Sequence, residues 1–250
     1  MSTTSGTPVG ECSVGFLLMV LSDGRFPSGA HAYSSGMEQS IAWHDVTGLA
    51  SLEEFVAGRV ATTGAMAAQV AAAASTLMTA ATAPQQTIGL DALDSAVDAR
   101  MASAASRAAS RQQGHSWLRG ARAVWPAELA SASPLLMDRH AWVTLGAATA
   151  ILGIDPQDAA CLALHDLVST LVWSAVRLLG LDPFEAAGIL AGTLAGVETE
   201  TRALAAEAVP ATEALCLGRV ETEWISWLAA PLSDLGAEAH AARAERLFAS

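Results

Sequence analysis

The sequence predicts an all-α fold, a helical bundle formed by a single domain. Hydrophobic residues make up 52% of the 250 residues and charged residues only 15%, a composition that supports a large buried core. Alternating polar and apolar patterns bounded by turns, which would indicate strands, are hard to find. Abundant Ala, Gly and Ser would let neighbouring helices pack at short distances.

The N-terminal half divides into a tail and a long apolar helix. We expect residues 1–10, MSTTSGTPVG, to be a disordered tail, with the folded domain spanning 11–250. Ser51 and Glu54 form a capping-box pattern, which predicts a helix from there to about Thr79. Val60 to Leu90 contains no charged residue, and we interpret it as a buried helix followed by a loop. Whether this stretch forms one helix or two stays open.

Helix starts in the C-terminal half are marked by capping residues and prolines. Asp155-Pro156 and Asp182-Pro183 each place an N-cap acceptor before a proline suited to the first helical position. Ser133-Pro134 and Ser233-Asp234 predict two further helix starts.

A central helix and three short linkers complete the predicted layout. Cys161 to Leu179 is apolar nearly all round, which is typical of a helix in the middle of a bundle. We expect linkers near residues 83–90, 126–134 and 207–213.

Charge and cysteine content exclude several functional classes. The net charge of −12 disfavours nucleic-acid binding, which needs a basic surface. Cys12, Cys161 and Cys216 form no CxxC pair, so reduced cysteines in a cytoplasmic protein are expected. VGFLLMVL (14–21) lacks a preceding basic residue and makes a poor signal peptide, and the polar content of 60–90 disfavours a membrane span.

The stretch LSDGRFPSGAHAYSSGMEQSI (21–41) stands out from the alanine-rich remainder. If residues 30–43 were helical, His31, Ser35 and Glu38 would share one face and resemble a Ser/His/acid set. No GxSxG elbow presents the serine, so we favour a recognition surface over a catalytic site.

Sequence motifs for metals and nucleotides are missing. The six histidines form no HxxxH or HExxH pattern, and no Walker A or GxGxxG motif is present. Histidines that meet only in space, or across a homodimer, stay open as a metal site. Binding to other proteins is therefore favoured over catalysis.

The C-terminal sequence GAEAHAARAERLFAS places His240, Arg243 and Leu247 on one helical face, with Arg246 and Phe248 alongside. Basic residues near a helix C-terminus can simply complement the helix dipole. A helix ending in Arg-Leu-Phe is also a plausible docking element.

Both ends of the chain resemble the urease accessory protein UreF family. The family's Leu-x-Asp-x-x-Phe-Pro-x-Gly and Ser-x-Gly-Leu-Glu motifs fall on Leu21, Asp23, Phe26, Pro27, Gly29, Ser34, Gly36, Met37 and Glu38. The terminal His and Arg-Leu-Phe-x-Ser correspond to His240 and to residues 246–250. SRAASRQQGHSWLRGA (106–121) and the segments 140–154 and 176–182 also fit the family.

The resemblance implies an all-α chaperone for urease maturation and nickel insertion, with no catalytic activity or bound cofactor of its own. It implies a homodimer that binds UreD (also called UreH) and the nickel-carrying GTPase UreG, and that docks on apo-urease. GTP would be bound by UreG, and nickel would be in transit toward urease.

The resemblance also implies which residues bear on partner binding. They are Phe26, Pro27, Gly29, His31, Tyr33, Ser34, Glu38, His240, Arg246, Leu247 and Phe248. Position 31 is His where the family usually has Phe or Tyr, which makes His31 a weak candidate for touching nickel. Two alternatives stay open: a metallochaperone that carries nickel itself, and a hydrolase acting through Ser34 or Ser35.

Overall fold

Helices account for all of the regular secondary structure that the computed structural model describes. It describes residues 13–29, 32–220, 223–226, 230–243 and 247–248. Over these ranges no strand occurs, and the predicted all-α class is confirmed. The predicted tail at 1–10 lies outside the described residues.

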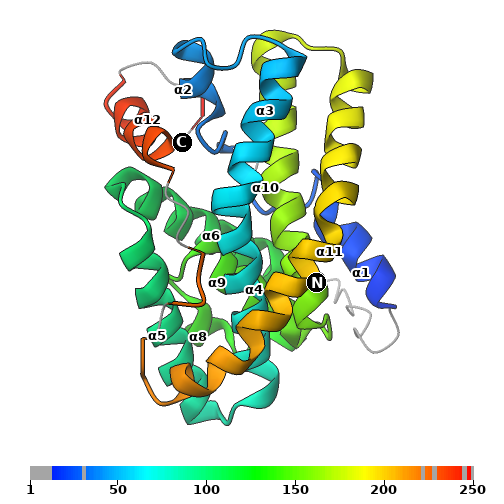
Figure 1. Ribbon diagram of the computed structural model, residues 1–250. Coiled ribbons are helices and arrows are strands. Elements are labelled where there is room, and N and C mark those ends of the chain that lie inside the picture. Colours follow the sequence, from blue (N-terminus) through cyan, green and yellow to red (C-terminus); the bar gives the residue numbers. More distant parts are fainter. Residues whose placement is uncertain (1–12, 30–31, 221–222, 227–229, 244–246, 249–250) are drawn as a thin grey trace, which may run out of the picture.

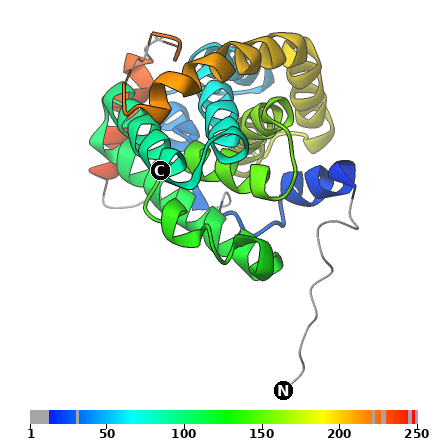
Figure 2. The same ribbon diagram turned by 90° about the horizontal axis from the view of Figure 1, so that it is seen from below.

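Four helices form the centre: α4 (Ala65–Ala80), α9 (Ala141–Ile151), α10 (Pro156–Leu179) and α11 (Pro183–Cys216). Helix α4 packs against the other three, and α11 lies along the outside of α4 and α10 in Figures 1 and 2. The contact of α4 with α9 is very close, because a Cβ atom on Gly146 would lie 2.1 Å from the Ala71 carbonyl oxygen. The abundance of small residues thus permits the short helix distances that the sequence predicts.

The N-terminal helices are α1 (Val14–Ser22), α2 (Met37–Ala42) and α3 (Leu49–Arg59). One turn of π-helix, Val60–Gly64, joins α3 to α4. The predicted start at Ser51 is slightly late, because the Ser51 hydroxyl accepts the Gly48 N–H at 3.2 Å from inside the first turn. Ser51 therefore stabilises the start of α3 without being its N-cap residue.

A second group of helices follows a very short connection. Helix α5 (Ala83–Arg100) covers the whole segment expected as a linker at 83–90, so that prediction is wrong. Pro84 lies in the first turn, where its missing N–H costs nothing, and Gln85 accepts the Thr82 N–H at 3.0 Å. The open question about 60–90 is thereby answered, because two helices separated at Ala81–Thr82 occupy it.

Helix α6 (Ala104–Val124) is followed by α7 (Pro126–Leu129) and α8 (Ser133–Leu136). The expected linker at 126–134 therefore contains most of two single-turn helices. Ser133 begins α8, as Ser133-Pro134 predicts.

The Asp-Pro pairs start helices as predicted. The Asp155 carboxylate accepts the Asp158 N–H at 2.9 Å, and the Asp182 carboxylate accepts the Phe184 N–H at 2.8 Å. The expected linker at 207–213 is wrong, because Pro210 lies inside α11. Buried contacts on both sides of Pro210, at Ala205, Ala208 and Leu215, outweigh the one hydrogen bond that it cannot make.

The last described helix, α12 (Pro231–Ala241), begins two residues before the Ser233 start that the sequence suggests. It packs on α2 and α6, away from the four central helices (Figure 1).

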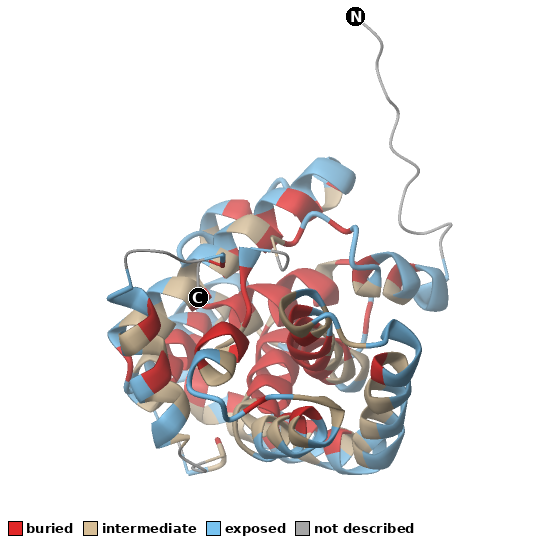
Figure 3. Cartoon of the chain, turned by 90° about the horizontal axis from the view of Figure 1, so that it is seen from above, coloured by how far each residue is buried: buried red, intermediate tan, exposed pale blue. Residues whose placement is uncertain are grey.

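Buried residues concentrate on the central helices, as Figure 3 shows. They form two apolar clusters, one around α4, α5, α6 and α9 and the other around α2, α3 and the second half of α10. Leu49–Ala80 and Pro156–Leu179 are long and apolar enough to cross a membrane, but 67% of each apolar window is buried among other helices. Both segments thus have the character of core helices.

Candidate functional site

The turn in the first motif is anchored on α6. The Phe26 ring lies between the indoles of Trp117 and Trp125, with centroid distances of 5.8 and 6.1 Å. A Cβ atom on Gly120 would meet the Pro27 carbonyl oxygen at 2.6 Å, so the chain approaches α6 closely there. Gly29 has a φ of +84°, which favours glycine. These contacts hold the turn at Phe26, Pro27 and Gly29 against α6.

The segment after this turn does not align the proposed Ser/His/acid set on a helix. Helix α2 begins only at Met37, and Ser35 has a φ of +51° that no α-helix accommodates. Ser34 is fully buried, and its hydroxyl accepts the Glu38 N–H at 3.3 Å. His31 lies outside the described residues, so its role as a nickel candidate stays a prediction.

Glu38 joins the first motif to the end of the chain. Its carboxylate accepts a hydrogen bond from His240 Nε2 at 2.8 Å. It also accepts the backbone N–H groups of Leu247 at 3.0 Å and Phe248 at 3.1 Å. We call Glu38, His240, Leu247 and Phe248 the Glu38 clamp. Two motifs at opposite ends of the sequence thus form one structural unit.

The electrostatics of the clamp favour an ionised Glu38. Burial alone would raise the pKa of its carboxyl group, but the hydrogen bonds from His240, Leu247 and Phe248 outweigh this effect. The pKa of Glu38 therefore lies below its usual value. Because an ionised carboxylate only accepts hydrogen bonds, His240 Nε2 carries a hydrogen and donates it.

The predicted partner-binding residues differ in their exposure. Phe26, Tyr33, Ser34, Glu38, His240 and Phe248 are buried, whereas Pro27 and Leu247 are exposed. The Phe248 ring also packs 4.7 Å below the Arg177 guanidinium. Arg246 lies outside the described residues. Partner binding by this set stays a prediction.

A second contact holds α12, and no sequence motif predicts it. The Glu238 carboxylate accepts the Ser103 hydroxyl at 2.7 Å and the Ala105 N–H at 3.0 Å, at the start of α6. Negative charge is favoured at a helix N-terminus. The pKa of Glu238 is accordingly lowered, chiefly by the backbone hydrogen bond from Ala105. Only the tertiary structure places Ser103 beside α12.

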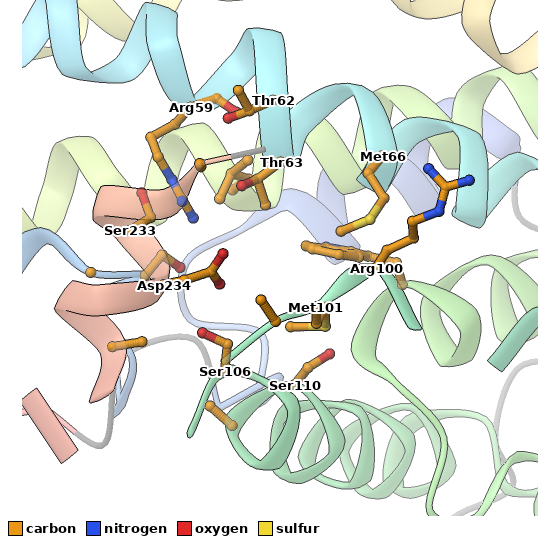
Figure 4. A pocket seen from close by; sticks show the side chains of 18 of the residues that line it. Arg59, Thr62, Thr63, Met66, Arg100, Met101, Ser106, Ser110, Ser233 and Asp234 are labelled. Atoms are coloured by element: carbon orange, nitrogen blue, oxygen red, sulfur yellow. The ribbon is translucent and has the colours of Figure 1, made fainter. Parts of the chain in front are cut away.

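A cleft of about 310 Å³ separates α12 from the body of the protein (Figure 4). Helix α3 contributes Arg59, and the π-helical turn contributes Thr63. Helix α6 contributes Ser106, and α12 contributes Ser233 and Asp234. In Figure 4 the Arg59 side chain extends toward Ser233 and Asp234. Sequence reasoning did not identify this cleft, because its residues come from segments that lie far apart in the chain. A π-helical turn often accompanies a functional site, but its sequence, VATTG, has no recognisable signature.

One wall of the cleft is reinforced by a buried histidine. His140 is fully buried, with Nδ1 3.0 Å from the Ser110 hydroxyl and Nε2 2.9 Å from an Asp98 carboxylate oxygen. Asp94 accepts the His140 N–H at 2.8 Å, and Ser110 accepts the Ala141 N–H. This network caps the N-terminus of α9 and links α5, α6 and α9.

No group of three or more histidine, cysteine or acidic side chains that could hold a metal ion occurs among the described residues. The site is a cleft between packed helices, lined by apolar side chains together with hydroxyl and charged groups.

A family comparison decides what kind of protein carries this site. The UreF family model matches residues 46–194, more than half of the chain. The chain belongs to the UreF family. The resemblance seen in the two end motifs is thereby confirmed.

Curated relatives match a larger share of the chain than the family model does. Urease accessory protein UreF of Mycobacterium marinum is 36% identical over 234 residues, covering 94% of this chain and 98% of that protein. The protein of the same name from Mycobacterium tuberculosis H37Rv is 39% identical over 172 residues, covering 68% of this chain and 75% of that protein. UreF of Mycobacterium sp. strain JLS is 35% identical over 233 residues, covering 93% of this chain and 97% of that protein. UreF membership makes this chain an accessory protein with a role in urease maturation.

Proposed function

We propose that this UreF-family protein is a cytoplasmic chaperone that acts in urease maturation through docking contacts and catalyses no reaction itself. As a homodimer it would hold UreD/UreH and the GTPase UreG together on apo-urease. It would couple GTP hydrolysis in UreG to delivery of nickel, which is cargo in this scheme.

The observation that carries the proposal is the way the Glu38 clamp displays the C-terminal region. Three leucines are left exposed there: Leu232 at 71%, Leu235 at 63% and Leu247 at 80%. Side chains of this kind gain free energy when a partner covers them. Helix α12 and the segment after it thus have the composition of a helix-based docking surface, held in place from below by Glu38.

The main experiment is expression of a urease operon with and without this chain. We expect urease made without it to contain little nickel and to show little activity. Full nickel content and activity in its absence would contradict the proposed function.

A surface variant tests the docking region more sharply. The double substitution Leu232→Ser and Leu235→Ser should weaken co-purification with UreD/UreH or UreG while leaving the far-UV CD spectrum unchanged. Phe184→Ser is a matched control, because Phe184 is 86% exposed on α11, away from α12. Equal loss of co-purification in the control would show that general surface hydrophobicity is responsible.

Direct nickel carriage is the alternative function, and it depends on His31. Equilibrium dialysis of the purified protein against nickel would support it if stoichiometric binding were found and were lost in His31→Ala.

A further inference from the structure

Arg59 is a largely buried cation, and the part of the chain that the structure describes supplies no ion-pair partner for it. Its Nε atom is shielded from solvent and has no hydrogen-bond acceptor among the described residues. None of the ion pairs between described residues involves its guanidinium group, although Asp234 lies near enough to influence it electrostatically. Burial lowers the pKa of Arg59 to about 10, so the side chain remains charged at neutral pH. Burying an unpaired charge costs free energy, and a group of opposite charge that hydrogen-bonds to it would offset this cost.

The surroundings of Arg59 indicate what kind of ligand would pair with its guanidinium group. Thr63, Ser106 and Ser233 line the same cleft and offer hydroxyl groups, and Arg100 adds a second positive charge to the lining. Asp234 contributes one negative charge, so the cleft is on balance cationic. Helix α12 also begins there, and the N–H groups of a first helical turn favour an anion.

We propose that the cleft between α12 and the π-helical turn binds a small monocarboxylate, whose two oxygens would meet the Arg59 guanidinium. A planar guanidinium matches a carboxylate through paired hydrogen bonds. The cleft volume of about 310 Å³ lies at the lower end of the range for ligand sites, which favours a small molecule. The Asp234 carboxylate would repel a polyanion such as a nucleotide. This proposal does not depend on the proposed function.

Ligand-observed NMR with sodium propionate tests the proposal. Titrations would be made at constant ionic strength with sodium chloride as the reference, on the full-length protein. We expect saturable binding in the millimolar range for so small a ligand. Competition by acetate and no competition by chloride should accompany it.

Two substitutions with opposite expected effects make the test specific. Arg59→Gln should weaken propionate binding about tenfold or more, since it removes the charge that holds the carboxylate. Asp234→Asn should tighten binding by roughly two- to fivefold, because it removes a competing negative charge from the cleft. Arg25→Gln is the control, because Arg25 is 93% exposed on another part of the surface, and it should leave binding unchanged.

The outcomes separate clearly. The proposal is overturned if propionate shows no saturable binding, or if Arg59→Gln binds as well as the unmodified protein. If the CD spectrum shows that Arg59→Gln does not fold, Asp234→Asn decides: tighter binding supports the site, and unchanged or weaker binding overturns it.

Discussion

His240 Nε2 lies 2.8 Å from a carboxylate oxygen of Glu38, although 202 residues separate the two in the chain. Their side chains are only 3% and 8% exposed. The contact holds α12 and the segment after it against α2. It also makes Glu38 a single point at which that region can be tested.

Glu38→Gln should loosen the C-terminal segment. The amide keeps the shape of the carboxylate but loses its charge, and charge-assisted hydrogen bonds contribute about 1.5–3 kcal/mol each. We expect faster hydrogen exchange at Leu247 and Phe248 and faster proteolysis near the C-terminus. Glu54→Gln, on the exposed side of α3, is the matched control. Unchanged exchange at both amides would refute the clamp.

The clamp should also weaken in acid. The pKa of Glu38 is lower in the folded protein than in the unfolded chain, so the clamp contributes its full stability above the usual carboxyl pKa. That contribution is lost as the pH falls through the lowered value. Amide exchange at Leu247 and Phe248, measured from pH 6 down to about pH 3, should therefore accelerate more than exchange in α4. Parallel changes in both regions would indicate global unfolding instead.

Asp166→Asn should stabilise the protein at neutral pH. Burial raises the pKa of Asp166 from 3.8 to about 6, and Gln113 is its one hydrogen-bonding side chain within the described residues, at 3.4 Å. The folded protein binds the proton more tightly than the unfolded chain, so stability falls as the pH rises from about 4 to 6 and stays low above that. Asparagine avoids this penalty, which is at most roughly 3 kcal/mol.

Urea unfolding at pH 7.5 and pH 4 measures this effect. The variant should gain stability at pH 7.5 and show little difference at pH 4. A similar gain at both values would assign the effect to packing instead of ionisation.

Gly146→Ala should destabilise the α4–α9 contact. An added methyl group would overlap the backbone of Ala71, and neither helix can shift without disturbing the core, so we expect a loss of about 2 kcal/mol or more. Gly188→Ala is the opposite case, because Gly188 faces open space on α11 and alanine favours a helix by about 1 kcal/mol. The midpoint temperatures of thermal unfolding should therefore shift in opposite directions, downward for Gly146→Ala and upward for Gly188→Ala. A loss of stability in Gly188→Ala would contradict the geometry.

Local signals predicted much of the fold. The Asp155-Pro156 and Asp182-Pro183 pairs start helices in the structure because side-chain capping and proline geometry act within one turn. The apolar segment at 161–179 forms most of α10, one of the four central helices, for an equally direct reason, the absence of a polar face. The segments wrongly expected as linkers, 83–90 and 207–213, each contain a proline. Pro84 fits a first turn, and Pro210 is overridden by burial around it.

The sequence by itself determined the all-α class and the family, because these depend on composition, periodicity and the order of motifs along the chain. Only the tertiary structure decided that Glu38 meets His240, Leu247 and Phe248, and that Glu238 meets Ser103. It also decided that Arg59 faces Asp234 across a cleft. Those contacts join segments that are distant in sequence, and their positions depend on how the helices pack together.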